Sequence, residues 1–320
     1  MSEKSNRNRT IDLTIEEGAE YLDRCIKISS KINDKNSIIN KTILGDTLKI
    51  LPLLPNNFVD LLIVDPPYNL SKDYENKQFK EMDDNEYENY TNTWIEKVKH
   101  CLKETASIYV CCDWKSSLII GQVLQKHFKI QNRITWQREK GRGAETNWKN
   151  GMEDIWFATN GNKYTFNLNA VKIRRKVIAP YKNEGKPKDW EETKDGNFRN
   201  TCPSNFWDDI SIPYWSMPEN TTHPTQKPEK LMAKLVLASS NLGDVILDPF
   251  LGSGTTSVVC KKLGRNYVGI EQNERYCIYC EKRLEMAEKD KTIQGYTDGV
   301  FWERNTAGLQ KKIKKKDLFD

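Results

Sequence analysis

One short stretch of the sequence places a carboxylate, two prolines and an aromatic ring directly after an apolar run. Val59–Val64 is almost wholly apolar, and the chain continues with Asp65, Pro66, Pro67 and Tyr68. A run of this kind is typical of a strand buried on both faces of a parallel sheet, with the acid at its carboxyl end. Each proline fixes φ and removes a backbone donor. The turn therefore offers only hydrogen-bond acceptors and a ring.

This set of groups suits a planar ring that carries an exocyclic amino group. The Asp65 carboxylate and the carbonyls of the turn can accept from the amine, and Tyr68 offers a stacking face. The alternative is a strand that simply ends in a proline-rich turn. Asp-Pro alone is common in that role, whereas Asp-Pro-Pro-Tyr after an apolar strand favours function. Ligands of open α/β sheets lie outside these strand ends.

A second chemical signature lies near the other end of the chain. Its parts are a strand over 244–248 that ends in Asp248, a Gly-rich turn over 249–256, a helix over 257–263, and a strand over 265–270 followed by Glu271. This is the order of a nucleotide-binding βαβ unit, in which the acid accepts from ribose hydroxyls and glycines let the backbone approach the ligand. The two glycines alone are a weak signal, and Glu271 on the next strand strengthens it.

Strand and helix patterns alternate along the rest of the chain, which predicts βαβ units. Further strands are expected over 42–46, 107–112, 131–137 and 154–158, and helices over 47–54, 93–102, 116–128 and 229–240. Asp46 also closes a predicted strand, so it could bind a ligand or cap the helix that follows. Residues 69–92 are acidic and poor in apolar side chains, which is typical of a mobile lid or of a solvated loop.

The N-terminal residues predict an amphipathic helix. Thr14 and Glu17 have the spacing of a capping box, and Ile15, Ala19, Leu22 and Ile26 then fall on one helical face. A scaffold or dimer contact is the expected role of this helix.

Composition excludes several classes of protein. The 320 residues carry a formal net charge of +5, which permits a nucleic-acid partner without requiring one. We find neither an apolar run long enough for a membrane span nor a secretory signal, so a soluble, cytoplasmic protein with reduced thiols is expected. Cys277 and Cys280 have a metal-like spacing, but no second Cys or His pair answers it. We therefore expect no metal site and assign both thiols to a helix face.

Two regions have the composition of a DNA-binding surface. The loop over 138–152 interleaves glycines and Trp148 with basic residues, and it predicts either phosphate contact or a solvated connector. Residues 160–222 lose apolar periodicity and predict an irregular insert with a basic and aromatic surface. The candidate DNA-binding residues are Arg138, Lys140, Arg142, Lys149, Lys172, Arg174 and Arg175. A basic run over 311–316 could add weak, non-specific DNA attraction or be a solvated end.

Taken in order, these motifs resemble the β class of DNA amino-methyltransferases. In that family a D-P-P-Y turn precedes an F-x-G-x-G cofactor loop, and a target-recognition region lies between them. Here Asp65–Tyr68 comes first and Phe250–Gly254 comes last, while His223–Pro228 matches the family's H-P-T-x-K-P element. The resemblance covers roughly residues 40–290.

The resemblance implies an α/β fold, with a doubly wound, mostly parallel Rossmann-like methyltransferase sheet and an inserted irregular target-recognition region. The expected segments are an N-terminal helical extension (1–40), the catalytic half (41–159), the target-recognition region (160–222), the cofactor-binding half (223–290) and a basic C-terminal tail (291–320).

The resemblance also implies a cofactor, S-adenosyl-L-methionine, and a role for each matching residue. Asp65, Pro66, Pro67 and Tyr68 match the catalytic turn. The residues at cofactor-binding positions are Asp46, Asp65, Thr225, Lys227, Asp248, Phe250, Gly252, Ser253, Gly254, Thr255 and Glu271.

The implied activity is methyl transfer to the N6 amine of a flipped-out adenine in a short site of double-stranded DNA. An acid at position 65 favours adenine within the family, and methylation of cytosine N4 remains an alternative. Methylation of cytosine C5 would need a Pro-Cys dipeptide, and none occurs. A non-catalytic DNA-binding module is the alternative outside enzymes. Family membership further implies a restriction-modification system with a cognate endonuclease, and relatives that pair favour a homodimer.

Overall fold

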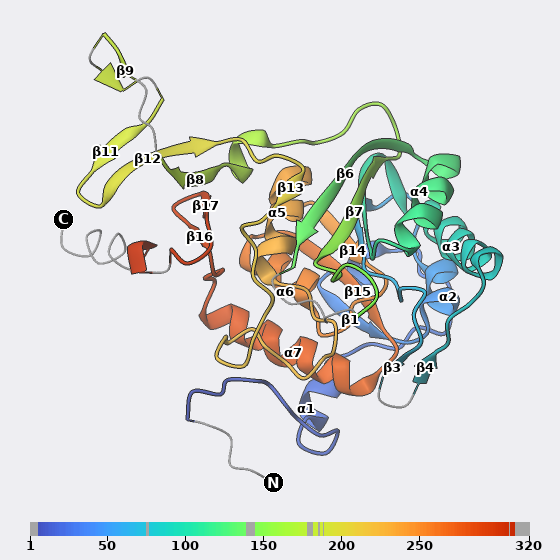
Figure 1. The fold of residues 1–320 in the computed structure, drawn as a ribbon. Coiled ribbons are helices and arrows are strands. Elements are labelled where there is room, and N and C mark those ends of the chain that lie inside the picture. The colour runs from blue at the N-terminus through green and yellow to red at the C-terminus, as the bar shows by residue number, and fades with distance from the viewer. Residues whose placement is uncertain are drawn as a thin grey trace.

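The computed structural model describes residues 6–74, 77–138, 145–177, 182–184, 186–187, 189–306 and 308–310, and an eight-stranded sheet forms its centre (Figure 1). The strand order is β1-β15-β14-β2-β5-β7-β6-β13, and five of the seven neighbouring pairs are parallel. The strands are β1 (Lys41–Leu44), β2 (Val59–Val64), β5 (Leu102–Cys112), β6 (Lys129–Gln137), β7 (Met152–Thr159), β13 (Phe206–Trp207), β14 (Val245–Asp248) and β15 (Asn266–Glu271). The expected mostly parallel α/β sheet is confirmed.

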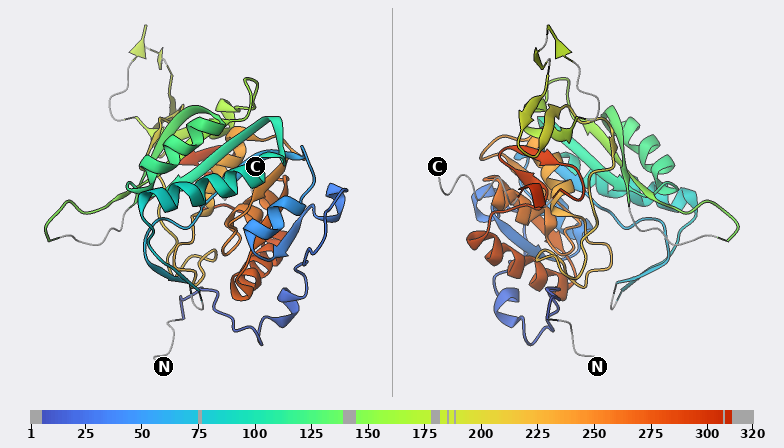
Figure 2. Two further views of the ribbon diagram at one scale, coloured as in Figure 1. Left: turned by 90° about the vertical axis from the view of Figure 1, so that its right-hand side faces the viewer. Right: turned by 60° about the vertical axis from the view of Figure 1, so that its left-hand side comes forward.

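Helices cover both faces of this sheet, as the views in Figures 1 and 2 show. They are α2 (Thr47–Ile50), α3 (Asp84–Lys99), α4 (Ser116–His127), α5 (Glu229–Ser239), α6 (Thr255–Lys262) and α7 (Glu274–Lys289), with single 3-10 turns η1 (Lys35–Ser37), η2 (Leu51–Leu53) and η3 (Leu168–Val171). Because side chains alternate along a strand, Leu61 and Ile63 of β2 pack with α5 and α6, whereas Leu62 and Val64 pack with α3 and α4. This explains why β2 is a continuous apolar run.

Strand direction gathers polar side chains at one edge of the sheet. β1, β15, β14, β2 and β5 are parallel, so their carboxyl ends meet at that edge. β7 runs antiparallel to β5, so its first residues lie at the same edge, and β6 ends there too. The edge therefore collects acids from strand ends together with the start of β7.

A second sheet is built mainly from the insert. Its order is β11-β12-β8-β17-β16. Its strands are β8 (Ile173–Lys176), β11 (Glu191–Thr193), β12 (Gly196–Thr201), β16 (Tyr296–Thr297) and β17 (Val300–Trp302), with a separate hairpin of β9 (Lys182–Asn183) and β10 (Lys186–Pro187). The insert expected to be irregular thus contains ordered strands, and β13 from the same region joins the central sheet.

The expected boundary at residue 291 is wrong. β17 pairs in parallel with β8, and Phe301 and Trp302 are buried, so residues 296–302 complete the second sheet. A basic composition farther along concealed this apolar strand. The basic run over 311–316 lies outside the described residues.

The prediction of a long N-terminal helix is also wrong. Only α1 (Ala19–Leu22) is helical, although the capping-box bonds between Thr14 and Glu17 are present. A Cβ built on Gly18 would lie 2.3 Å from the Ile278 side chain, so the chain approaches α7 closely here. Ile26 continues as a bridge to Ile43 of β1. Tertiary contact with α7 and the sheet edge outweighs the helical periodicity.

The prediction of a lid or loop over 69–92 fails for its second half, which is helical. β3 (Lys72–Tyr74) and β4 (Lys77–Phe79) form a hairpin, but α3 already begins at Asp84. Asp83 and Glu86 form a capping box, and Tyr87 and Thr91 extend the buried stripe of the helix. A good N-cap thus starts this helix nine residues before its expected start at residue 93.

The second sheet gives a stability prediction. Phe301 is fully buried against α5, so Phe301→Ala should lower the free energy of unfolding by about 3–5 kcal/mol. Leu242→Ala, at a residue that is 76% exposed, is the control and should cost less than about 0.5 kcal/mol. Thermal or denaturant unfolding measures both, and equal stability of the two variants would contradict a buried role for β17.

Candidate active site

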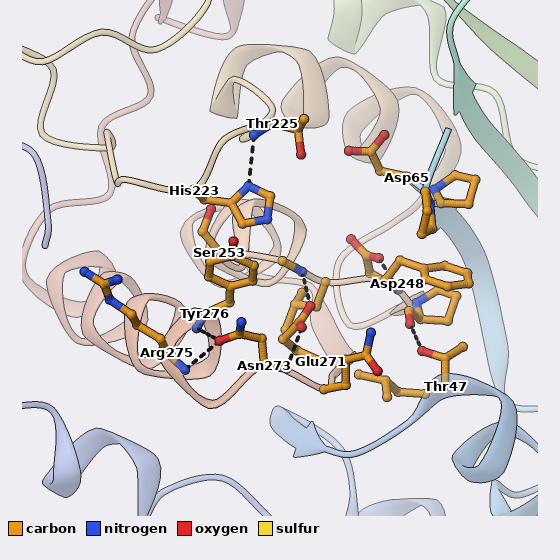
Figure 3. Close-up of a pocket in the computed structure, with 18 of the residues that line it drawn as sticks. Thr47, Asp65, His223, Thr225, Asp248, Ser253, Glu271, Asn273, Arg275 and Tyr276 are labelled. Carbon is orange, nitrogen blue, oxygen red and sulfur yellow. Dashed lines mark hydrogen bonds between the residues drawn. The ribbon is translucent and has the colours of Figure 1, made fainter. Parts of the chain in front are cut away.

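The two sequence motifs face one cavity of about 1180 Å³ at the polar edge of the sheet. Its lining includes the turn Asp65–Tyr68 from one half of the chain and Gly252 and Ser253 from the other. Figure 3 shows these groups converging, with Asp65 and Asp248 on one side and His223, Ser253 and Tyr276 on the other. The cavity thus unites segments that are almost 190 residues apart in the sequence.

The Gly-rich loop has a backbone that only glycine adopts easily. Gly252 has φ +56° and Gly254 has φ +84°. A Cβ on Gly254 would meet Cys280 Sγ at 2.3 Å, so this loop also packs tightly on α7. Glu271 holds the loop from below, because its Oε2 accepts from the Gly252 amide at 2.8 Å and its Oε1 from the Asn273 amide at 2.8 Å.

Arg283 is a buried support of the same loop that the sequence did not reveal. From α7 it donates to the Ser253 carbonyl at 2.8 Å and to Thr255 Oγ1 at 3.0 Å, and its second terminal nitrogen donates to Glu229 Oε1 at 3.2 Å. In the sequence, a single arginine in an amphipathic helix is typical of a surface residue. Only the packing of α7 against α6 reveals its role.

Asp46 lies on the cavity wall and also caps α2. Its Oδ1 accepts from the Leu48 amide at 2.8 Å, so the helix-capping alternative is correct for one of its oxygens. The neighbouring Thr47 hydroxyl donates to the Pro249 carbonyl, which ties this wall to the Gly-rich turn. The helix cap therefore holds the Asp46 side chain in place at the cavity wall, and the cap uses only Oδ1.

Asp248 is buried beneath the Gly-rich turn. Its oxygens accept from the Phe250 amide at 3.1 Å and from Thr256 Oγ1 at 2.6 Å. Burial raises the pKa of Asp248 to about 7, and these two hydrogen bonds only partly oppose that effect. The carboxylates of Asp65 and Glu271 raise the pKa further. Asp248 thus works as a structural support of the loop that also lines the cavity.

The His223–Pro228 segment forms the third wall. The Thr225 amide donates to His223 Nδ1 at 3.3 Å, and a Cβ on Gly252 would lie 3.0 Å from His223 Nε2. Lys227 also lines the cavity. Its ammonium group turns to Asp65 and donates to both carboxylate oxygens, at 2.8 and 2.6 Å.

A partly buried cluster, which we call the catalytic corner, surrounds the carboxylate of the D-P-P-Y turn. It consists of Asp65, Tyr68, Lys227 and Glu153. The Tyr68 hydroxyl lies 3.0 Å from Asp65 Oδ1 and 3.1 Å from Glu153 Oε2, and Lys227 Nζ lies 3.4 Å from Glu153. Burial, Asp65 and Glu153 all raise the pKa of Tyr68, so its hydroxyl stays protonated.

The charge state of Lys227 follows from the same contacts. Burial alone would lower its pKa, but Asp65 and Glu153 outweigh burial and raise the pKa above its ordinary value. The corner therefore contains a fixed ammonium group. The turn itself is held by Tyr87, whose hydroxyl donates to the Pro67 carbonyl at 3.0 Å.

The candidate DNA-binding residues separate into three groups. Arg138 lies at the sheet edge and donates to Glu153 Oε1 at 2.6 Å, next to the catalytic corner. Arg174 and Arg175 belong to the second sheet and pair with Glu191 and Glu303. The exposed Lys149 and the half-buried Lys172 lie in the loop before β7 and just before β8, while Lys140 and Arg142 lie outside the described residues.

The N-terminal segment contributes to the cavity, which the sequence did not indicate. Thr14, Ile15 and Glu16 line it. Arg275 of α7 anchors the segment by donating to the Leu13 carbonyl at 2.9 Å and to Asp12 at 2.7 Å. A capping box whose helix is only one turn long therefore closes one side of the cavity.

Among the described residues, no group of three or more His, Cys, Asp or Glu side chains is arranged to hold a metal ion. Cys277 and Cys280 are buried on α7, as the helical interpretation predicted. None of the helices in the described part of the chain has the length and apolarity of a membrane span.

The raised pKa of Asp248 predicts a pH effect on stability. An unfolded Asp has a pKa near 3.8, so between that value and about 7 the folded protein binds more protons than the unfolded chain. Stability should therefore fall as pH rises through this window. Asp248→Asn removes the titration, so from about pH 6 to about pH 8.5 the melting temperature of the wild type should fall relative to the variant by about 2 °C or more. Parallel melting curves at all pH values would show that Asp248 is ionised throughout.

The chain is similar to known proteins over a stretch that contains both motifs of the cavity. Residues 59–282 match a family model described as DNA methylase. The chain is 34% identical over 252 residues to the type II methyltransferase M.HpaI of Haemophilus parainfluenzae, covering 77% of this chain and 74% of that protein. It is 33% identical over 268 residues to the DNA adenine methyltransferase YhdJ of Escherichia coli, covering 80% and 84%.

A solved structure shares the fold at lower identity. The cytosine-N4-specific PvuII DNA methyltransferase superposes with a TM-score of 0.56 at 16% identity, covering 82% of this chain and 93% of that one. The matched region spans the acid-proline turn, the Gly-rich loop and the strands that carry them to one cavity. On this combination of sequence match and shared architecture, the chain belongs to the DNA methylase family.

Proposed function

We propose that this protein transfers a methyl group from S-adenosyl-L-methionine to the N6 amine of adenine in double-stranded DNA. The observation that carries the proposal is the single cavity shared by the Asp65–Tyr68 turn and the Gly252–Thr255 loop. Methyl transfer requires donor and acceptor to meet, and each motif supplies one half of that requirement. The relative YhdJ, named a DNA adenine methyltransferase, supports adenine as the base.

The residues of the cavity fit such a cofactor. S-Adenosyl-L-methionine supplies a methyl group on a positively charged sulfur. Asp46 and Glu271 line the cavity, whereas Lys227 is paired with Asp65, and this acidic lining favours a cation over the pyrophosphate of a dinucleotide. Residues on three walls would hold its parts: Glu271 the ribose, Asp46 the adenine amine, and the loop with Thr225 the amino-acid end. A side chain at position 252 would crowd His223, so glycine suits this point of the loop.

The catalytic turn would activate the target amine. An aromatic amine is a poor nucleophile, because its lone pair is delocalised into the ring. Of the four lone pairs of the Asp65 carboxylate, Tyr68 and Lys227 engage three, which leaves one on Oδ2 for the amine. Asp65 and the Pro66 carbonyl would accept the two N–H groups and stabilise positive charge that develops on nitrogen.

The position of Tyr68 qualifies its expected role. Its hydroxyl is fixed on Asp65 and Glu153, so the ring is held at the turn and would present one face to a base that enters beside Asp65. The base cannot reach this edge from within a duplex, so it must be flipped out. The DNA backbone would contact Arg138, Lys149 and Lys172, and the insert would read the sequence; Lys140 and Arg142 remain candidates. Arg174 and Arg175 would attract the DNA electrostatically rather than contact it directly, because acids already pair with them.

The wider setting belongs to the same proposal. The relative M.HpaI is named a type II methyltransferase, which supports a role in a restriction-modification system with a cognate endonuclease. A homodimer and a cytoplasmic location accompany that role.

Labelled methyl transfer tests the function directly. Incubation of the protein with methyl-labelled cofactor and mixed-sequence duplex DNA, followed by nucleoside analysis, should yield N6-methyladenosine in its deoxy form. N4-methyldeoxycytidine would replace adenine by cytosine as the target. Cofactor binding without transfer to any duplex would instead indicate a DNA-binding module.

Asp65 provides the sharper prediction. Asp65→Ala should lower kcat by about 100-fold or more, because it removes the acceptor of the target amine, while calorimetry should still detect cofactor binding, because Glu271 and the Gly-rich loop are unchanged. Asp60→Asn is the matched control, since Asp60 lies at the other end of β2 and pairs with Lys103. An Asp65→Ala variant with a wild-type kcat at saturating cofactor and a much weaker affinity for cofactor would reverse the roles assigned here.

A further inference from the structure

The catalytic corner holds a second carboxylate that the methyl-transfer mechanism above does not use. We infer that Glu153 is a positioning residue that sets the charge at Asp65, and that Arg138 neutralises it until DNA phosphate draws Arg138 away. This inference rests on the proposed function. It adds a link between DNA capture and the chemistry of the target amine.

The contacts of Glu153 connect the sheet edge to the reacting carboxylate. Its Oε1 accepts from Arg138 at 2.6 Å, and its Oε2 lies 3.1 Å from the Tyr68 hydroxyl and 3.4 Å from Lys227 Nζ. Glu153 and Lys227 are 5% and 6% exposed, so neither can exchange its partners for water. A continuous chain of polar contacts thus runs from Arg138 through Glu153 to Asp65.

Proton counting shows that Tyr68 cannot satisfy both acids at once. Its hydroxyl has one proton, yet Asp65 and Glu153 lie at nearly equal distances, 3.0 and 3.1 Å. When an incoming amine donates to Asp65, the Tyr68 proton can turn to Glu153 without leaving a buried donor unpaired. Glu153 therefore gives Tyr68 a second acceptor and frees a lone pair on Asp65 Oδ1, in addition to the one on Oδ2 that is already open to the amine.

Charge counting gives Arg138 its role. Asp65 and Glu153 carry two negative charges, and Lys227 and Arg138 carry two positive charges, so the group as a whole is neutral. The ammonium group of Lys227 lies against Asp65 and opposes positive charge on the target nitrogen. If Arg138 leaves, the corner gains a net negative charge in a buried setting, which favours that developing positive charge.

Arg138 is the member of the group that can move. Its side chain is 38% exposed, whereas Glu153 beside it is 7% exposed. It follows the last residue of β6, in the loop that also carries Lys149 and the 93% exposed Trp148. Guanidinium groups bind phosphate as well as carboxylate, so a DNA backbone over this loop competes directly for Arg138.

Glu153→Gln tests the charge while keeping the shape and an acceptor for Tyr68. We expect kcat to fall by about 30-fold, with KM for DNA and the affinity for cofactor within about threefold of wild type. Asp154→Asn is the matched control, because Asp154 is the adjacent buried acid, bonded to Ser117 and Thr135 and turned away from the corner. Its kcat should stay within about threefold of wild type. A Glu153→Gln kcat within the same limit would overturn the role of Glu153.

Arg138→Gln tests the coupling at a side chain that is 38% exposed. We expect KM for DNA to rise by about tenfold and kcat at saturating DNA to stay within about threefold, because the negative charge of the corner is then permanent. A fall in kcat equal to that of Glu153→Gln would overturn the release of Arg138. The double variant should have the kcat of Glu153→Gln alone. Absence of transfer by the wild type with cofactor bound would refute the proposed function, whereas an active Glu153→Gln beside an active wild type refutes only this inference.

Discussion

The ion pair between Lys227 and Asp65 is the contact on which the rest of the site depends. It joins two residues separated by 162 positions, and it brings the acid-proline turn against the segment that leads into α5. Lys227 is 6% exposed and Asp65 is 18% exposed, so loss of Asp65 would leave the buried ammonium group with only the longer contact to Glu153. The pair therefore fixes how the two halves of the central sheet present their motifs to one cavity.

Around this pair, several buried residues hold the Gly-rich loop in place, in addition to the groups that face the cavity. Glu271 holds Gly252, Arg283 holds Ser253 and Thr255, and Asp248 holds the turn before them. Each support comes from a strand end or a helix packed beneath the loop. Such buried hydrogen bonds keep a glycine-rich backbone in one conformation, which a binding site for a small cofactor needs.

The second sheet shows how the end of the chain participates in the same architecture. β17 completes the sheet that begins with β8, and Lys230 of α5 donates to the carbonyls of Asp209 and Trp302. Asp209 also pairs with Lys234, so α5 carries both the cofactor-side core and the insert. These contacts connect the insert to the helix that follows Lys227.

The sequence by itself determined the fold class, the order of seven of the eight central strands along the chain and the two motifs that meet in the cavity. Apolar strands and the Gly-rich turn are local signals, because burial on both faces and positive φ restrict residue types directly. It also indicated the family and its cofactor through the order of those motifs.

Only the tertiary structure decided which polar residues meet. Glu153 comes to Tyr68 because β7 runs antiparallel, and no local pattern records the direction of a strand. Arg283 is buried because α7 packs on α6, and Ile15 reaches the cavity because the N-terminal segment follows α7 instead of forming a helix. Contacts between distant segments depend on the packing of the whole chain, and that is why these residues could not be identified from their neighbours in sequence.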